Sequence, residues 1–165
     1  MDNLNTPLNI MLSEPNKYDY NIELYCKILS FLPFLEEATE DDYIKYHNDN
    51  TFEYSPHFYS FIRTVFDSKM VEDPKEMTAF LTKYNSPKAY SLWIKDMNKV
   101  LSDSALCDKI NISFIRKAFF TMIKLEKIMP GSWGIDVETG NWLKLLKALQ
   151  RILPQVYKCD KGEMN

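Results

Sequence analysis

The chain has 165 residues, of which 45% are hydrophobic and 26% charged, and its formal net charge is −3. This length suits a single domain that buries a core without a disulfide or a metal. The net negative charge argues against generic binding to nucleic-acid phosphates, and the presence of only four glycines argues against a turn-rich β-sandwich.

The first 18 residues are polar and contain Pro7 and Pro15, which predicts an irregular N-terminal arm. We expect a single helical domain over residues 19–154 and a flexible polar tail over residues 155–165. The first helix of this domain is expected to begin with Asp19 as its N-cap and to end or kink at Pro33.

Residues 36–54 are acidic and asparagine-rich with interspersed aromatic residues, and this pattern leaves open a loop, a short helix or both. The three helix starts that follow are sharper, because each pairs a capping residue with proline at the first helical position. These starts are Ser55-Pro56, Asp73-Pro74 and Ser86-Pro87. Glu76, three residues after Asp73, adds the pattern of a capping box.

Ser113 is the expected N-cap of a long helix that stops before Pro130, and a last amphipathic helix is expected over residues 141–153. Between them lie three of the four glycines, Gly131, Gly134 and Gly140, which predict a specifically shaped connection. No window of more than four residues alternates as a strand does. The predicted fold is therefore all-α, a compact single-domain bundle of five to seven helices.

Motifs that carry chemistry are missing from the sequence. Only two histidines are present, and there is neither a C-x-x-C pair nor a glycine-rich phosphate loop. We therefore expect no metal site, no cofactor and no catalytic residue, and we predict that the protein is not an enzyme. The three cysteines (Cys26, Cys107 and Cys159) are odd in number and widely spaced, which predicts a reduced setting. Since no signal peptide and no membrane-spanning run is recognisable, a cytoplasmic location without membrane contact is expected.

Two residues beside the glycines have alternative interpretations. Glu126 lies near a helix end, where the helix dipole disfavours a carboxylate unless Arg116, Lys127 or a backbone N–H of the glycine segment offsets it. The favoured role is to hold the glycine segment in place, and the alternative is contact with a ligand. Trp133, like Trp142, is expected either to fill the core or to anchor a binding interface.

Charge is unevenly distributed, with a net charge of −9 over residues 1–80 and +6 over residues 81–165. Solvated faces explain most such patterns, and the alternative is an acidic patch at Glu36, Glu37 and Glu40 that engages a basic partner. Cationic residues of the last two helices could form a basic face: Lys117, Lys124, Lys127, Lys144, Lys147 and Arg151. Because no aromatic residues for base stacking are interleaved with them, we expect no nucleic-acid partner.

The run from Phe114 to Trp133, followed by Gly140 and the leucines of 143–149, resembles an uncharacterised bacterial and phage family, domain of unknown function 6508. Glu126, Gly131 and Gly140 match the family's pattern. Lys127 stands where the family has arginine, and the next residue is Ile where the family has an aromatic. The resemblance extends over residues 55–153 but is specific only in the last forty. It implies an all-α, intracellular protein of microbial or mobile-element origin, and it implies no reaction.

These observations favour a small intracellular helical interaction protein, in concrete form a phage or mobile-element inhibitor of a host or defence complex. The expected partner is a protein, and a homo-oligomer is left open. The candidate partner-binding residues are Trp133, Glu126, Lys127, Glu36, Glu37 and Glu40. The alternative is a small-ligand binder or enzyme with a pocket at residues 126–142.

Overall fold

Helices make up most of the computed structural model, which describes residues 4–17 and 22–153. In chain order the helices are α1 (Thr6–Leu12), α2 (Ile22–Leu29), α3 (Leu32–Glu37), α4 (Glu40–Tyr43), α5 (Pro56–Asp67), α6 (Pro74–Thr82), α7 (Ala89–Ser102), α8 (Ser104–Cys107), α9 (Ile112–Ile128), α10 (Ser132–Glu138) and α11 (Asn141–Ile152). The described residues therefore contain more helical segments than the five to seven predicted, because several segments are only one or two turns long.

One small sheet interrupts the helical fold. Strands β1 (Ile44–Tyr46) and β2 (Phe52–Tyr54) pair antiparallel, with Ile44 opposite Tyr54 and Tyr46 opposite Phe52. The prediction of a strictly all-α fold is wrong at this point. Each strand is too short to show a period-2 pattern, and Asn50 takes the left-handed backbone conformation in the connection between them (φ 65°).

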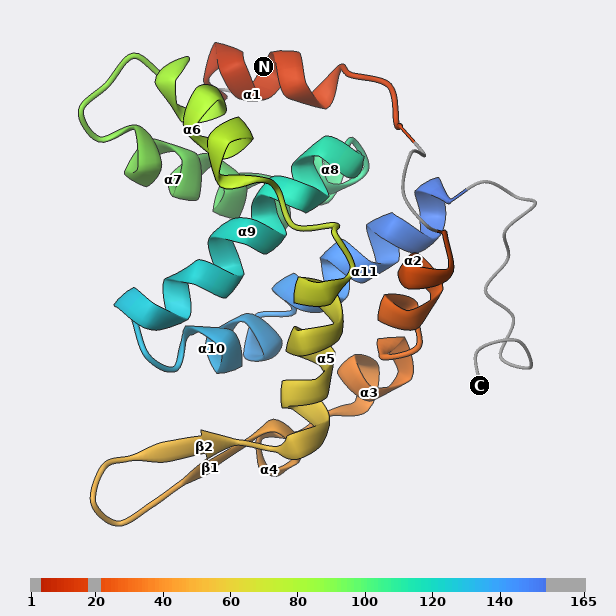
Figure 1. Cartoon of the computed structure of the whole chain (residues 1–165), viewed down its shortest axis with the longest axis vertical. Helices are drawn as coiled ribbons and strands as arrows, with labels where there is room; N and C mark the ends of the chain where they lie inside the picture. The colour runs from red at the N-terminus through yellow and green to blue at the C-terminus, as the bar shows by residue number, and fades with distance from the viewer. Residues whose placement is uncertain (1–3, 18–21, 154–165) are drawn as a thin grey trace.

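The hairpin and α1 lie at opposite ends of the longest axis of the molecule, and α9 and α11 cross the middle (Figure 1). Helix α11 packs against α2, α3, α9 and α10, which makes it a central element. The largest side chains that are fully buried are aromatic: Trp93, Trp142, Tyr25, Phe58, Phe61, Phe114 and Phe119. Edge-to-face ring pairs connect neighbouring helices, for example Phe61 of α5 with Trp142 of α11, at a centroid distance of 5.4 Å.

Two of the predicted helix starts are confirmed. The Ser55 hydroxyl accepts a hydrogen bond from the backbone N–H of Phe58, and the Asp73 carboxylate accepts one from Lys75 N–H, each with proline in the first turn. The capping box with Glu76 is not formed, because Glu76 pairs with Arg116 instead. At Ser86-Pro87 the chain makes a turn first, and α7 begins at Ala89.

The N-cap of α9 is Asn111, whose side chain accepts a hydrogen bond from Phe114 N–H, so the assignment to Ser113 is wrong. Pro33 lies in the first turn of α3, and the preceding helix α2 already ends at Leu29. The predicted N-cap Asp19 and the predicted tail 155–165 lie outside the described residues.

The prediction of an irregular arm over the first 18 residues is wrong at α1. Tertiary hydrogen bonds hold this helix against the rest of the fold. Asn5 donates from its backbone and side chain to the buried Asp96 carboxylate, at 3.3 and 2.8 Å. Asn111 donates to the carbonyls of Met11 and Glu14, at 2.8 and 3.1 Å. Seven residues form a marginal helix in isolation, so these contacts are what stabilise α1.

Cys26 is disulfide-bonded and Cys107 is a free, half-buried thiol. The reduced setting expected from the number and spacing of the cysteines is therefore not what the structure has at Cys26. Within the described residues, no helix combines the length and apolar character required to cross a bilayer.

Candidate functional site

The glycine segment forms a helical corner rather than a plain loop. Gly131 and Gly140 have φ angles of +97° and +79°, and they are the N-cap residues of α10 and α11. Side chains rarely adopt this conformation, so glycine is required at both turns. The helix between them was not expected, because its flanking glycines made the whole stretch resemble a connection.

Glu126 holds this corner together. One carboxylate oxygen accepts from Gly131 N–H at 2.7 Å, and the other accepts from Trp133 N–H at 3.0 Å and from the Tyr54 hydroxyl at 2.5 Å. Burial and the hydrogen bond to this carboxylate raise the pKa of Tyr54 far above its usual value of 10.0, so the tyrosine remains a donor. The prediction that Glu126 holds the glycine segment is confirmed, and Tyr54 of the hairpin is a partner that sequence reasoning missed.

Trp133 is half-buried, and its ring packs on the other aromatic residues of this end of the molecule. Its indole N–H donates to the carbonyls of Met122 and Ile123, each at 3.2 Å. The ring lies 5.5 Å from Tyr54 and 6.2 Å from Tyr59 between centroids. Trp142 is completely buried, so the core-filling interpretation is confirmed for Trp142 and applies only in part to Trp133.

Most of the strongly exposed large hydrophobic side chains gather at the same end. Among the described residues seven such side chains are exposed. Five of them belong to the hairpin, the N-terminal half of α5, α10 and the C-terminal end of α9 with the residue that follows it, and the other two are Ile10 of α1 and Phe66 at the C-terminal end of α5. We name these five the apolar corner: Tyr46 (63% exposed), Tyr59 (52%), Ile128 (64%), Met129 (56%) and Ile135 (54%). Figure 1 shows the hairpin at one end of the long axis, with α10 and the C-terminal end of α9 on the same side of the molecule, between the hairpin and the middle.

A series of ring contacts connects the two tyrosines of the apolar corner, Tyr46 and Tyr59, through half-buried aromatic residues. Tyr46 lies 6.3 Å from Phe52 between centroids, and Phe52 lies 5.4 Å from Tyr54. Tyr54 in turn meets Trp133, which meets Tyr59. These two exposed tyrosines therefore stand on a packed series of aromatic rings.

Charged residues of both signs border this surface. Lys127 and Lys124 are exposed on α9 beside Ile128. On the other side, Glu40 is the first residue of α4 and Glu138 is the last residue of α10, and both are exposed. Burial together with the charges of Glu138 and Glu40 raises the pKa of Tyr43, the residue before β1. Of the candidate partner-binding residues, the structure therefore brings Trp133 and Glu126 into direct contact and places Lys127 and Glu40 nearby. Glu36 and Glu37 are exposed on α3, outside the elements that carry the apolar corner.

Asp136 of α10 is a partly buried carboxylate in the helical corner. It accepts a hydrogen bond from the Asn141 side chain at 2.9 Å. Burial raises the pKa of Asp136 to about 6 despite that hydrogen bond, and the charge of Glu126 adds to the increase. Nothing in the sequence pattern indicates this perturbed acid, since it depends on how α10 packs.

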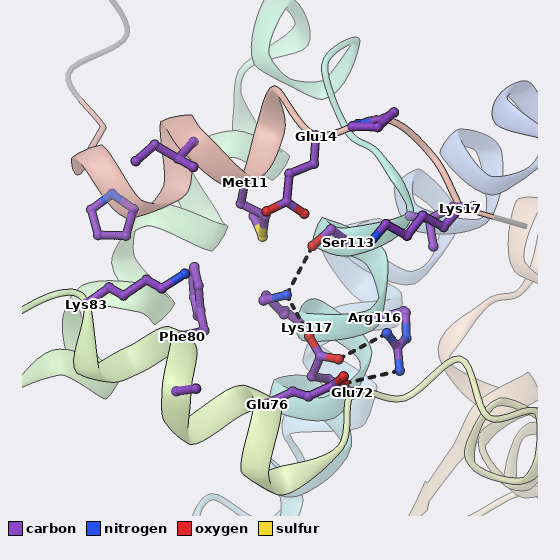
Figure 2. A pocket seen from close by; sticks show the side chains of 15 residues that line it. Met11, Glu14, Lys17, Glu72, Glu76, Phe80, Lys83, Ser113, Arg116 and Lys117 are labelled. Carbon is purple, nitrogen blue, oxygen red and sulfur yellow. Dashed lines mark hydrogen bonds and ion pairs between the residues drawn. The ribbon is translucent and has the colours of Figure 1, made fainter. Parts of the chain in front are cut away.

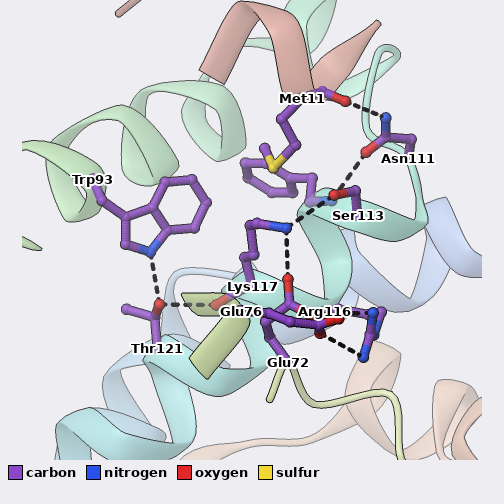
Figure 3. Close-up of polar contacts among 10 residues, drawn as sticks. Met11, Glu72, Glu76, Trp93, Asn111, Ser113, Arg116, Lys117 and Thr121 are labelled. Atoms are coloured by element: carbon purple, nitrogen blue, oxygen red, sulfur yellow. Dashed lines mark hydrogen bonds and ion pairs between the residues drawn. The ribbon is translucent and has the colours of Figure 1, made fainter. Parts of the chain in front are cut away.

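A second polar constellation lies at the other end of α9, around the buried carboxylate of Glu72 (Figure 3). One oxygen of Glu72 meets the Lys117 ammonium at 2.6 Å and the other meets the Arg116 guanidinium at 3.1 Å. Lys117 also donates to the Ser113 hydroxyl at 3.0 Å, and Arg116 reaches Glu76 at 3.6 Å. Burial alone would raise the pKa of Glu72, but its hydrogen bonds and the two cations hold that pKa below its usual value.

The expected basic face on the last two helices is corrected by this cluster. Lys117 is only 9% exposed and is neutralised by Glu72, while the Arg151 side chain donates to the carbonyl of Ile110. The prediction of a basic face was wrong for Lys117 because its partner, Glu72, lies 45 residues away in sequence. In the sequence alone, Ser113, Arg116 and Lys117 have the spacing of an ordinary solvent-exposed helix face. The spacing of Ser113 and Lys117, one turn apart, was the only signal available.

The described part of the chain contains no group of three or more His, Cys, Asp or Glu side chains arranged to hold a metal ion. Comparison of the chain with protein-family models, with curated proteins and with solved structures found no match. The resemblance to domain of unknown function 6508 accordingly stays a prediction, and the functional argument depends on the geometry alone.

Proposed function

We propose that this protein acts by binding another protein through the apolar corner. The single observation that carries the proposal is the concentration of strongly exposed large hydrophobic side chains at that end of the molecule. Isolated exposed hydrophobic residues are common, whereas a group of them on one part of the surface is typical of an interaction site.

The side chains in and around the apolar corner also indicate the chemical character of the partner's surface. Aromatic residues and methionine are enriched in the centres of protein interfaces, and charged residues surround such centres. A matching partner has an apolar centre, acidic groups facing Lys124 and Lys127, and basic groups facing Glu40 and Glu138. More specifically, we propose that the protein is a phage or mobile-element inhibitor of a host or defence complex. The phage or mobile-element origin is suggested only by the resemblance to domain of unknown function 6508.

The alternative function, a pocket at residues 126–142 that uses Glu126, receives no support from the geometry. Both carboxylate oxygens of Glu126 already accept hydrogen bonds from the protein itself. A ligand or a substrate proton would have to displace one of those donors.

The test is a comparison of captured partners between the wild-type protein and the double variant Met129→Glu/Ile135→Glu. Both side chains are more than half exposed, so we expect the variant to fold normally and to lose its specific partner. Phe66→Glu is the matched control, because Phe66 is 62% exposed at the C-terminal end of α5 and does not belong to the apolar corner. Retention of every specific partner by the folded double variant would contradict the proposal.

Charge reversal provides a second, independent test. Lys127→Glu and Glu40→Lys should each slow association with the partner, and the effect should diminish at high salt because surface charges are screened. Sedimentation analysis of the purified protein identifies the case in which the partner is a second copy of the chain.

A further inference from the structure

A pocket of about 320 Å³ lies between α1, α6 and the N-terminal half of α9, beyond the reach of the proposed protein interface. Figure 2 shows its walls: Met11 and Glu14 on one side, Phe80 and Lys83 on another, and Ser113 with Lys117 at the back. This volume is at the lower end of the range for small-molecule sites.

One part of the pocket is apolar and well ordered. Phe80, Met11 and Ile112 line it, and each is at most 6% exposed. The Phe80 ring is held edge-on against Trp93 at 5.2 Å and against Tyr84 at 5.4 Å between centroids. The apolar wall is therefore already formed and does not have to be ordered by a ligand.

The back of the pocket is polar and presents donors. The Lys117 ammonium carries three N–H groups, of which two donate to Glu72 and to Ser113, and the ammonium also lies over the Phe80 ring, 5.2 Å from its centroid. Ser113 accepts from Lys117, and among the described contacts its own hydroxyl hydrogen has no acceptor. The two carboxylate oxygens of Glu72 face Lys117 at 2.6 Å and Arg116 at 3.1 Å, so its negative charge is offset within the back wall.

The charges at the mouth favour an anion. The charges of Glu72 and Glu76 are offset by those of Arg116 and Lys117, which leaves Lys17, Lys83 and Glu14. The two lysines reach toward the pocket from opposite sides (Figure 2), and neither makes an ion pair with another described residue. A single remaining carboxylate therefore faces two remaining cations.

We propose that this pocket binds a small organic anion, with an apolar body against Phe80 and Met11 and a carboxylate or phosphate facing Ser113 and Lys117. Lys17 and Lys83 attract the anionic group at the mouth. This inference is independent of the apolar corner, because no residue is shared between the two sites and they lie at opposite ends of α9.

The test is an NMR titration of the full chain with four probes of similar shape. Benzoate and phenyl phosphate carry the anionic group, benzyl alcohol is neutral, and benzylamine is cationic. We expect saturable shifts of the backbone amides of Met11, Lys83 and Ser113 with one or both anions, with the tighter anion identifying the carboxylate or phosphate class. Binding of benzylamine at least as tight as that of benzoate, or no saturable shift at these amides with either anion, would overturn the proposal.

Variants at the mouth test the charge argument. Lys17→Gln and Lys83→Gln should each weaken binding of the anion by about two- to fivefold, as expected for one exposed ion pair. Glu14→Gln should strengthen it by a similar factor, because a repelling charge is removed. Weakening by Glu14→Gln instead would show that the pocket selects a cationic group. Lys124→Gln is the matched control, since it removes the same charge from α9 outside the pocket.

A blocking variant keeps the test independent of the electrostatics. Ala79 lines the pocket and its side chain is exposed, so Ala79→Trp places an indole in the mouth without disturbing the core. Loss of binding with an unchanged melting temperature is the expected result. Unaltered binding would locate the anion elsewhere on the surface and contradict the proposal.

Discussion

Glu126 is the residue on which the helical corner depends, since it accepts hydrogen bonds from two backbone amides and from the Tyr54 hydroxyl. Glu126→Ala leaves those donors without their acceptor, so we expect the free energy of unfolding to fall by about 2–3 kcal/mol. Tyr54→Phe removes only one donor and should cost about 1 kcal/mol. Urea unfolding of the two variants measures the difference, and equal losses would show that the amide bonds contribute nothing.

Asp136 makes the stability of the corner depend on pH. Because burial raises the pKa of its carboxyl from 3.8 to about 6, the folded state holds this proton more tightly than the unfolded state. The folded protein therefore loses stability as the pH rises from about 4 to about 6, and the loss is complete above that range.

Asp136→Asn removes this titration. We expect the variant to be more stable than the wild-type protein at pH 7 by about 1–2 kcal/mol, with the difference disappearing near pH 4. Unfolding curves at the two pH values measure it. A difference that is the same at both pH values would assign the effect to packing rather than to charge.

At the scale of secondary-structure elements, we expect alanine substitutions at two glycines of the helical corner, Gly140 and Gly134, to have opposite effects on stability. A Cβ at Gly140 would meet no heavy atom within 4 Å, so Gly140→Ala should cost about 1 kcal/mol through its φ of +79° alone. Gly134 is inside α10, where a Cβ would lie 3.5 Å from Tyr43 and Ile44, an ordinary contact distance. Gly134→Ala should therefore stabilise the protein by about 0.5–1 kcal/mol. Thermal unfolding of both variants gives the signs.

The helix starts at Ser55 and Asp73 were predictable because the capping residue, the proline and the orphan N–H groups are all local. The hairpin and α1 were not predictable for the opposite reason. Strands of three residues and a helix of seven residues are stable only through partners distant in sequence, such as Asp96 for Asn5.

The candidate sites show the same difference between features set by local sequence and features set by distant contacts. Glu126 and Trp133 could be singled out because the glycines beside them are visible in the sequence. The apolar corner could not be predicted from the sequence. Ile128, for example, continues the apolar spacing of α9 and would be assigned to the core, yet it is 64% exposed because it lies at the end of its helix. The Glu72 cluster depends on a contact between α9 and the segment before α6, and no local pattern records such a contact.

At the scale of the whole molecule, the Glu72 cluster connects the segment before α6 to α9. Besides the ion pairs, the backbone N–H of Glu72 donates to the carbonyl of Arg116 at 3.1 Å. Glu72→Ala leaves two neighbouring cations without their buried counter-charge, so we expect a loss of about 3–5 kcal/mol. The double variant Glu72→Leu/Lys117→Leu should recover most of this loss, because it removes a buried charge from each side.

Double-mutant analysis of urea unfolding measures that recovery. Because the pKa of Glu72 is lowered in the folded protein, its stabilisation should be full at neutral pH and should decline as the pH falls below its usual value of 4.5. If the double variant is no more stable than Glu72→Ala, then steric fit rather than charge balance governs this position.

The hydrogen bond between Tyr54 and Glu126 joins residues that are 72 positions apart. Since neither the hairpin nor α10 is long enough to persist alone, the two should open and close as one cooperative unit, and their amide hydrogens should exchange with solvent at a common rate. The other two tryptophans are completely buried, so Trp133 is the natural fluorescent reporter of this opening. A partner that binds the apolar corner would then slow the exchange of both segments together, although they are far apart in the chain.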